Sequence, residues 1–253
     1  MKIYEYKKTS SLIKAIANKL VNISHTLEAD TINIALSGGS TPKGIFELLS
    51  TSEYINQVNW DKCHFWWGDE RFVSDLSEDS NYGVACRLLF DKLPKKIINN
   101  LHPIKYCRSS KEASLNYRNE LENNIRLEDG MPIFDWVILG MGDDGHTASL
   151  FMDDLALGST QYTEVVNHPL TKQERVTLTL PVINSSKMIS IIVSGEAKSN
   201  ILSQVFSSSP SESRSKYPIE YIEAYNGSLE WCIDSSAASF CDFHQQANYT
   251  LYS

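Results

Sequence analysis

The sequence predicts one α/β domain with a doubly wound, mostly parallel sheet and helices on both faces. Two observations lead to this prediction. Short runs of Ile, Val, Leu and aromatic residues alternate along the chain with longer segments of helical periodicity. Several of the short runs are apolar throughout, as is typical of strands covered on both faces. We find no internal repeat and no linker, so residues 1–253 are expected to form a single domain.

The expected elements follow one another in this order along the chain. Strands are predicted at residues 32–36, 64–67, 134–139, 176–180 and 188–194, which are rich in β-branched and aromatic residues and end at polar residues or glycine. Helices are predicted at residues 11–22, 42–49, 81–92, 111–127 and 197–206, where apolar residues recur at helical spacing. Further strands are expected at 219–224 and 230–233, and Asp234 is expected to cap a last helix from Ser235. The Ser-rich stretch 207–215 is expected to be a mobile surface loop.

The composition excludes several classes of partner. The chain holds 23 Lys and Arg against 31 Asp and Glu, a formal net charge of -8, which repels nucleic acids and anionic membranes. Its five cysteines are scattered and include no C-x-x-C pair, which favours reduced thiols. No signal peptide and no membrane-spanning run is recognisable. We therefore expect a cytoplasmic protein that binds neither nucleic acid nor membrane. A small-molecule ligand and a monomeric or weakly homo-oligomeric state are expected in addition, without support from these observations.

Two junctions between a strand and the next segment carry residues that suit a ligand. In α/β sheets, ligands bind at the carboxyl ends of the strands. The first junction, Ser37-Gly38-Gly39-Ser40-Thr41-Pro42, suits an anion held by backbone N–H groups at the start of a helix. A plain turn with a helix cap is the alternative, although it needs fewer such residues. The second junction, Gly68-Asp69-Glu70-Arg71, would suit a sugar phosphate or, alternatively, a surface salt bridge.

The third junction runs from residue 140 to 147 and contains His146. Its G-x-G-x-x-G spacing matches a dinucleotide fingerprint, but Asp143 and Asp144 would lie where a pyrophosphate must bind, so we reject that interpretation. The glycines are better explained as bringing His146 and Asp144 into a cleft, where a carboxylate can orient a histidine that acts as general base. A structural histidine and a metal site built from Asp and His are the alternatives. No H-x-x-x-H motif or similar second pair of ligands supports the metal site.

Two further basic residues follow the same pattern. Arg175 precedes the strand expected at 176–180, and Lys198 lies at the start of the helix expected at 197–206. Each alone is typical of a solvated surface charge. Together with Arg71 they could supply the positive lining that a phosphorylated substrate requires.

These segments resemble a known family. SGGSTP (37–42), WGDER (67–71), GMGDDGHTASLF (140–151), RVTLTL (175–180) and GEAK (195–198) are similar, in that order, to 6-phosphogluconolactonases. SGGSTP alone is shared with the related glucosamine-6-phosphate deaminases. The resemblance spans nearly the whole chain and implies their modified Rossmann fold. It also implies hydrolysis of 6-phospho-D-glucono-1,5-lactone to 6-phosphogluconate, the second step of the oxidative pentose phosphate pathway, without a metal or organic cofactor.

The resemblance also implies a role for each matching residue. His146 would be the catalytic base that activates water, and Asp144 would orient it. Asp69 would lie close to the sugar ring. The ligand site would be lined by Gly38, Gly39, Ser40 and Thr41. The phosphate or the developing oxyanion would be contacted by Arg71, Arg175 and Lys198. The chain departs from the family at Met152, where most members have proline.

Two other functions stay open at this point. An aminosugar-phosphate deaminase or isomerase on the same scaffold is disfavoured by Arg71, because deaminases typically have an aromatic residue after the acidic pair. A non-catalytic sugar-phosphate-binding protein is disfavoured by His146, because a binding protein needs no base beside Asp144. No G-x-S-x-G elbow is present to support a serine hydrolase. Lactone hydrolysis needs only a base for water, oxyanion donors and a group that positions the substrate.

Overall fold

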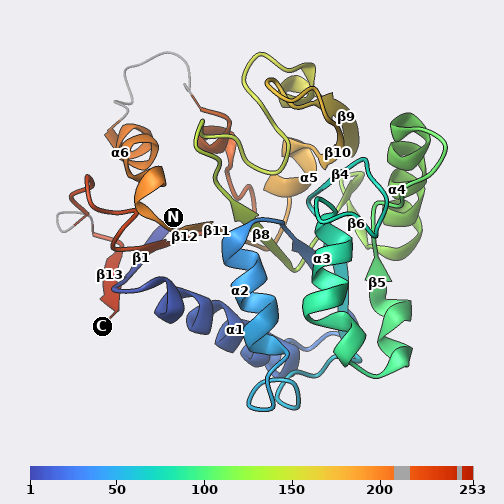
Figure 1. The fold of residues 1–253 in the computed structure, drawn as a ribbon, viewed down its shortest axis with the longest axis horizontal. Helices are drawn as coiled ribbons and strands as arrows, with labels where there is room; N and C mark the ends of the chain where they lie inside the picture. Colours follow the sequence, from blue (N-terminus) through green and yellow to red (C-terminus); the bar gives the residue numbers. More distant parts are fainter. Residues whose placement is uncertain (208–216, 244–246, 253) are drawn as a thin grey trace.

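A parallel sheet forms the centre of the molecule in the computed structural model, which describes residues 1–207, 217–243 and 247–252 (Figure 1). Among these residues the sheet has eight strands in the order β13-β1-β12-β11-β8-β2-β3-β5, and all its pairings are parallel. In chain order the strands are β1 (Lys2–Tyr6), β2 (Ile32–Leu36), β3 (Cys63–Trp67), β5 (Leu101–His102), β8 (Trp136–Gly140), β11 (Met188–Val193), β12 (Ser228–Asp234) and β13 (Tyr249–Tyr252). The predicted α/β class and mostly parallel sheet are confirmed.

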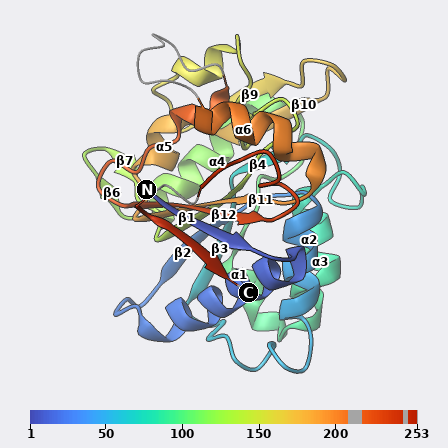
Figure 2. The ribbon, with the colours of Figure 1, turned by 90° about the vertical axis from the view of Figure 1, so that its left-hand side faces the viewer.

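Helices cover both faces of this sheet. The first three, α1 (Thr9–Thr26), α2 (Ser40–Leu49) and α3 (Asn81–Leu88), lie on one face. The other three, α4 (Ser110–Asn124), α5 (Leu180–Asn184) and α6 (Ser199–Ser207), lie on the opposite face (Figure 2). Because both faces are covered, every residue of β2 is buried. Short 3-10 turns complete the helical segments: η1 (Phe90–Lys92), η2 (Lys95–Asn100), η3 (Leu155–Gly158), η4 (Glu196–Lys198) and η5 (Pro218–Tyr221).

A second, antiparallel sheet stands beside the carboxyl end of the first. It consists of β4 (Asp69–Arg71), β10 (Glu174–Leu178) and β9 (Thr163–Asn167), with β10 in the middle. The strand predicted at 176–180 therefore exists, but it belongs to this sheet and not to the parallel one. A two-stranded hairpin is formed by β6 (Leu127–Glu128) and β7 (Met131–Pro132).

Two predicted elements near the carboxyl end are wrong. The strand expected at 219–224 does not form: Pro218–Tyr221 is the 3-10 turn η5, which is closed by the N–H of Ile222 donating to the carbonyl of Ile219 at 3.2 Å. The helix expected from Ser235 does not form; Asp234 accepts from the N–H of Ala237 at 2.9 Å, but only turns follow. The strand expected at 230–233 is confirmed within β12. Of the loop expected at 207–215, all but Ser207 lies outside the described residues.

The path of the chain through the sheet creates a crevice. From β2 the chain moves outward to β3 and β5, and it then returns to β8 on the other side of β2 before continuing to β11 and β12. The loops after β2 and β8 therefore diverge between these neighbouring strands. The hydroxyl of Ser37 joins them by donating to the carbonyl of Ile138 at 2.7 Å. The order of the strands thus places a ligand crevice between β2 and β8.

Asp234, at the end of β12, connects three parts of the fold. One carboxylate oxygen accepts from the hydroxyls of Thr9 and Ser194, each at 2.6 Å. The other accepts from the N–H groups of Gly195 at 3.1 Å and Ala237 at 2.9 Å. Burial by itself would raise the pKa of Asp234, but the hydrogen bonds hold this pKa below its usual range.

We expect Asp234→Asn to lower the free energy of unfolding at pH 7 by about 2 kcal/mol, because an amide NH₂ group would face buried donors. The folded pKa lies below the unfolded value of about 3.9, so the stabilisation is present above that value and is lost as pH falls through the folded pKa. Urea unfolding of both proteins measures the difference, which should be smaller at pH 3 than at pH 7. The same difference at both pH values would contradict this role for the carboxylate.

Candidate active site

The crevice contains a pocket with about 610 Å³ of empty space, part of which is open to solvent. Loops after four adjacent strands, β11, β8, β2 and β3, reach it. Of the predicted site residues, its lining brings together Gly38, Gly39, Asp69, Arg71, His146, Arg175 and Lys198. Ser40 lines an adjoining pocket that also borders Gly38, Gly39 and Arg71. Thr41, in the first turn of α2, lines neither of these two pockets.

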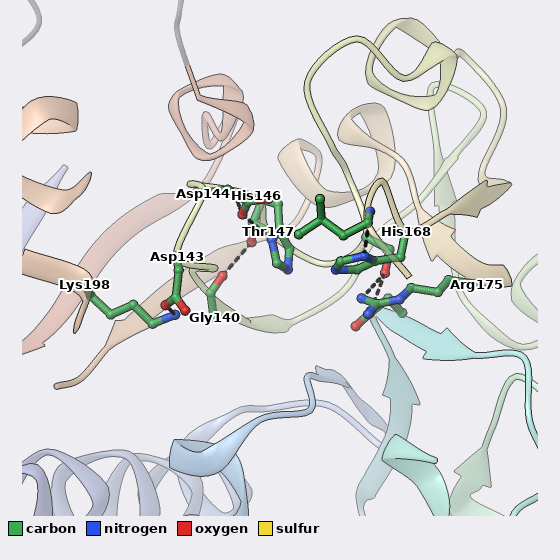
Figure 3. Close-up of polar contacts among 11 residues, drawn as sticks. Gly140, Asp143, Asp144, His146, Thr147, His168, Arg175 and Lys198 are labelled. Carbon is green, nitrogen blue, oxygen red and sulfur yellow. Dashed lines mark hydrogen bonds and ion pairs between the residues drawn. The ribbon is translucent and has the colours of Figure 1, made fainter. Parts of the chain in front are cut away.

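His146 and Asp144 form a hydrogen-bonded pair at this pocket (Figure 3). The Nδ1 atom of His146 lies 2.5 Å from a carboxylate oxygen of Asp144, which also accepts from the backbone N–H of His146 at 3.2 Å. The side-chain hydrogen bond from His146 holds the pKa of Asp144 well below its usual range, so Asp144 is a carboxylate. A carboxylate only accepts, which assigns the proton to Nδ1 and leaves Nε2 of neutral His146 free to accept a proton.

Glycines allow the histidine loop to turn this tightly. A Cβ atom on Gly142 would lie 2.1 Å from Nδ1 of His146 and 2.8 Å from the Asp144 carboxylate. The N–H of Gly142 donates to the carbonyl of His146 at 2.8 Å, and Gly145 has a φ of 76°. The next feature is an antiparallel bridge between Thr147 and Leu150, not a helix. The glycines therefore make room for the His146–Asp144 pair, in agreement with our rejection of a dinucleotide site.

Two arginines stand side by side in the second sheet. Arg175 in β10 pairs directly with Arg71 in β4, and both line the pocket. Among the described residues neither takes part in an ion pair, and the Nε atom of each is buried without a hydrogen-bond partner. Burial lowers the pKa of Arg175, an effect that the charge of Asp69 opposes. Two neighbouring guanidinium groups with unused donors suit a doubly charged anion such as a phosphate.

Lys198 supplies a third positive charge from η4, just after β11. Its ammonium group forms an ion pair with the carboxylate of Asp143. Figure 3 shows Lys198 and Arg175 on opposite sides of His146. His146 therefore lies between Lys198 and Arg175, an arrangement in which one end of a bound molecule can be held by a cation while the other end lies at the histidine.

Asp69 is held by its neighbours more tightly than the sequence suggested. It is only 5% exposed, and its carboxylate accepts from the hydroxyl of Ser149 at 2.6 Å. The amide of Asn81 donates to the Asp69 carbonyl at 3.0 Å, and a guanidinium N–H of Arg175 donates to the Ser149 hydroxyl at 3.3 Å. Asp69, Ser149 and Arg175 thus form one hydrogen-bonded chain at the wall of the pocket.

Glu70, the other carboxylate of the WGDER segment, is structural. It accepts from the N–H groups of Asn81 at 2.7 Å and Tyr82 at 2.8 Å, in the first turn of α3. It also accepts from its neighbour Arg71 at 2.8 Å. Burial raises the pKa of Glu70 to about 7, although these N–H groups act in the opposite direction. The carboxyl group fixes the start of α3 against β4 and does not line the pocket.

Met152, which stands where most proteins of the similar family have proline, lies in a turn. The N–H of Asp154 donates to the carbonyl of Phe151 at 3.3 Å, and Asp153 has a φ of 63°. Proline is favoured at the second position of such a turn, but Met152 also adopts it. Phe151 is 3% exposed and its ring centroid lies 4.8 Å from that of His146, so the loop still packs against this histidine.

The sequence interpretation missed four residues of this region: Asn81, Asp143, Ser149 and His168. Asn81 could have been found as the first residue of the helix after WGDER, and Ser149 lies within the most specific motif. Asp143 was considered only as an obstacle to a pyrophosphate. His168, whose ring centroid lies 5.3 Å from that of Phe151, has no local sequence signal.

The remaining sequence predictions concern cysteines, metals and membranes. All five cysteines are free thiols. Within the described part of the chain, no group of three or more His, Cys, Asp or Glu side chains is arranged to hold a metal ion. In the same residues, no helix combines the length and the apolar character needed to cross a membrane.

Comparison with known proteins gives a consistent result. A family model described as glucosamine-6-phosphate isomerases/6-phosphogluconolactonase matches residues 7–231. A 6-phosphogluconolactonase from Aggregatibacter actinomycetemcomitans is 41% identical over 209 residues, which cover 81% of this chain and 86% of that protein. A crystal structure of devB protein is 35% identical with a TM-score of 0.89, covering 95% of this chain and 100% of the other. The 6-phosphogluconolactonase from Trypanosoma cruzi is 26% identical with a TM-score of 0.82, covering 95% and 96%. Because the family model spans nearly all of the sequence, the chain belongs to the glucosamine-6-phosphate isomerase/6-phosphogluconolactonase family.

Proposed function

We propose that the protein is a 6-phosphogluconolactonase that hydrolyses 6-phospho-D-glucono-1,5-lactone to 6-phosphogluconate in the pentose phosphate pathway. The observation that carries this proposal is that His146, hydrogen-bonded to Asp144, lines a pocket together with Arg71, Arg175 and Lys198; Asp144 itself is not part of the lining. Relatives named 6-phosphogluconolactonase, at 36% to 41% identity over most of the chain, support it. A cytoplasmic location, a monomeric or weakly oligomeric state and activity without a cofactor stay predictions.

In the proposed reaction, Nε2 of His146 takes a proton from a water molecule as that water attacks the carbonyl carbon of the lactone. A carbon–oxygen bond forms, and the electron pair of the carbonyl moves onto its oxygen. When the tetrahedral intermediate collapses, the bond to the ring oxygen breaks and this oxygen takes the proton from the imidazolium. Asp144 stabilises the imidazolium, as a carboxylate does in other histidine-based sites. A general base of this kind contributes roughly 10²- to 10⁴-fold to the rate.

The reaction has two negatively charged groups, the phosphate and the developing oxyanion, and we expect the three cations to be shared between them. The phosphate is present throughout, whereas the oxyanion exists only in the transition state and the intermediate. Because Arg71 and Arg175 are adjacent, they suit the phosphate, with its several acceptor oxygens. The Asp69 oxygen that does not bind Ser149 suits a sugar hydroxyl. Holding the phosphate end in this way would bring the lactone carbon to His146.

Replacing His146 with alanine should lower kcat about 10²- to 10⁴-fold while leaving the dissociation constant of 6-phosphogluconate within about threefold of wild type. The physical reason is that the base acts in the transition state and makes little contact with the bound product. Stopped assays at low temperature limit spontaneous lactone opening, and calorimetry gives the dissociation constant. The control is His25→Ala, at an exposed histidine at the end of α1. Unchanged turnover in His146→Ala would refute the base.

Replacing Arg71 with alanine should raise KM about tenfold or more with a small effect on kcat. A contact to the phosphate stabilises the ground state and the transition state alike, so its loss weakens binding without slowing the bound reaction. Steady-state kinetics measures the two constants separately. Arg126→Ala is the matched control, since Arg126 forms an exposed ion pair with Glu128. A loss in kcat alone would assign the replaced residue to the oxyanion instead.

The rival function within the family can be tested directly. Purified protein should hydrolyse the lactone and should release no ammonia from glucosamine 6-phosphate. Product formation is followed by coupling 6-phosphogluconate to its dehydrogenase, and ammonia by a separate coupled assay. Robust deamination without lactone hydrolysis would overturn the proposed function. Binding of 6-phosphogluconate without either reaction would favour a non-catalytic sugar-phosphate-binding protein.

A further inference from the structure

His168 lies on the same face of the second sheet as the two arginines. In the antiparallel pair of β9 and β10, Val166 lies opposite Arg175. The pairing continues beyond β9, because the N–H of His168 donates to the carbonyl of Gln173 at 3.0 Å. Side chains alternate between faces along a strand, so His168, two residues beyond Val166, returns to the face that carries Arg175. Arg71 stands opposite Arg175 on the other side, on that face too.

The ring of Phe151 connects His168 to the site. The rings of His168 and Phe151 meet edge to face with centroids 5.3 Å apart. The guanidinium carbon of Arg175 lies 5.8 Å from the centre of the same Phe151 ring, and the His146 ring lies 4.8 Å from it. Figure 3 shows His168 beside Arg175 and facing His146. His168 does not itself line the pocket, but through the Phe151 ring it packs beside His146 and Arg175, which do.

The hydrogen bonds of His168 determine which nitrogen can act as a donor. Its Nδ1 atom accepts from the N–H groups of Leu170 and Thr171, each at 3.2 Å. Nδ1 therefore carries no proton, and the proton of the neutral ring lies on Nε2. Burial and the nearby charge of Arg175 lower the pKa of His168, which favours this neutral form at pH 7. No residue in the described part of the chain accepts a hydrogen bond from Nε2.

We propose that His168 is a substrate-binding residue whose Nε2–H donates a hydrogen bond to the phosphate group held by Arg71 and Arg175. The inference rests on the proposed function, because it requires a sugar phosphate in this pocket. A phosphate has three terminal oxygens with several lone pairs, so it can use a donor beyond the two guanidinium groups. A neutral donor adds this contact without placing another cation near His146, which becomes positively charged during the reaction.

A purely structural role would use the other nitrogen of His168. In that case its function would be to hold the turn at Leu170 and Thr171 through Nδ1, with Nε2 facing solvent. Two substitutions separate the roles. Asparagine places its side-chain oxygen close to the position of Nδ1 and can still cap the turn, but it lacks the distal donor. Glutamine places its amide nitrogen close to the position of Nε2 and keeps the distal donor, but it loses the turn acceptor.

The experiment compares wild type, His168→Asn and His168→Gln in lactone hydrolysis. His168→Asn should raise KM about tenfold, equivalent to about 1.4 kcal/mol, with kcat within about twofold of wild type. His168→Gln should keep KM within about threefold of wild type. The proposal is overturned if His168→Asn leaves KM unchanged, if it lowers kcat alone, or if His168→Gln is the more damaged variant. Thermal unfolding of the three proteins checks that each is folded.

Binding of inorganic phosphate provides a readout that needs no turnover. Isothermal titration calorimetry should show weaker phosphate binding to His168→Asn than to wild type, and near wild-type binding to His168→Gln. If wild type fails to hydrolyse the lactone but phosphate binding follows this pattern, the proposed function fails and the role of His168 stands. If wild type hydrolyses the lactone but phosphate binds equally well to all three proteins, the role of His168 fails and the proposed function stands.

Discussion

The buried hydroxyl of Ser149 holds the two halves of the site together. It donates to the carboxylate of Asp69 at 2.6 Å and accepts from the guanidinium of Arg175 at 3.3 Å. The backbone N–H of Ser149 donates to the hydroxyl of Thr177 at 3.1 Å. One residue of the histidine loop is thereby attached to both β4 and β10. Because Asp69 and Arg175 are each less than a tenth exposed, this chain of hydrogen bonds also compensates the cost of burying their charges.

Close backbone packing is the second constraint on the site. A Cβ atom on Gly38 would lie 1.8 Å from the side-chain oxygen of Asn81, and one on Gly142 would overlap the ring of His146. Asn81 begins α3, so the loop after β2 can approach this helix only where it has no side chain. In both loops, glycine is therefore required because a side chain would occupy the space of a neighbouring polar group.

The acidic composition of the chain is compatible with the anionic substrate proposed for it. The net charge repels at long range, whereas the residues of the pocket bind at short range. A net charge of -8 repels a polyanion along its whole length. The pocket, however, gathers Arg71, Arg175 and Lys198 within one small volume. Asp143 pairs with Lys198, and Asp69 is linked to Arg175 through the hydroxyl of Ser149. The carboxylates thus keep the cations in place. A phosphate would offer these cations a partner with more negative charge than a single carboxylate.

The sequence by itself determined the α/β class, the central strands and the residues at their carboxyl ends, including His146, Arg71 and Lys198. These follow from local signals, because apolar runs report burial and glycine-rich junctions report sharp turns. Only the tertiary structure decided that the strand predicted at 176–180 lies in a separate sheet, since periodicity shows that a strand is buried but not which strand it pairs with. The neighbouring strands β1 and β13, at one side of the parallel sheet, escaped prediction because they mix lysine, glutamate, threonine and tyrosine with few aliphatic residues. Ser149 and His168 acquire their positions through contacts with residues distant in sequence or through the register of a strand pair. Such contacts are settled by packing and hydrogen bonding across the whole fold, which no local pattern of residues encodes.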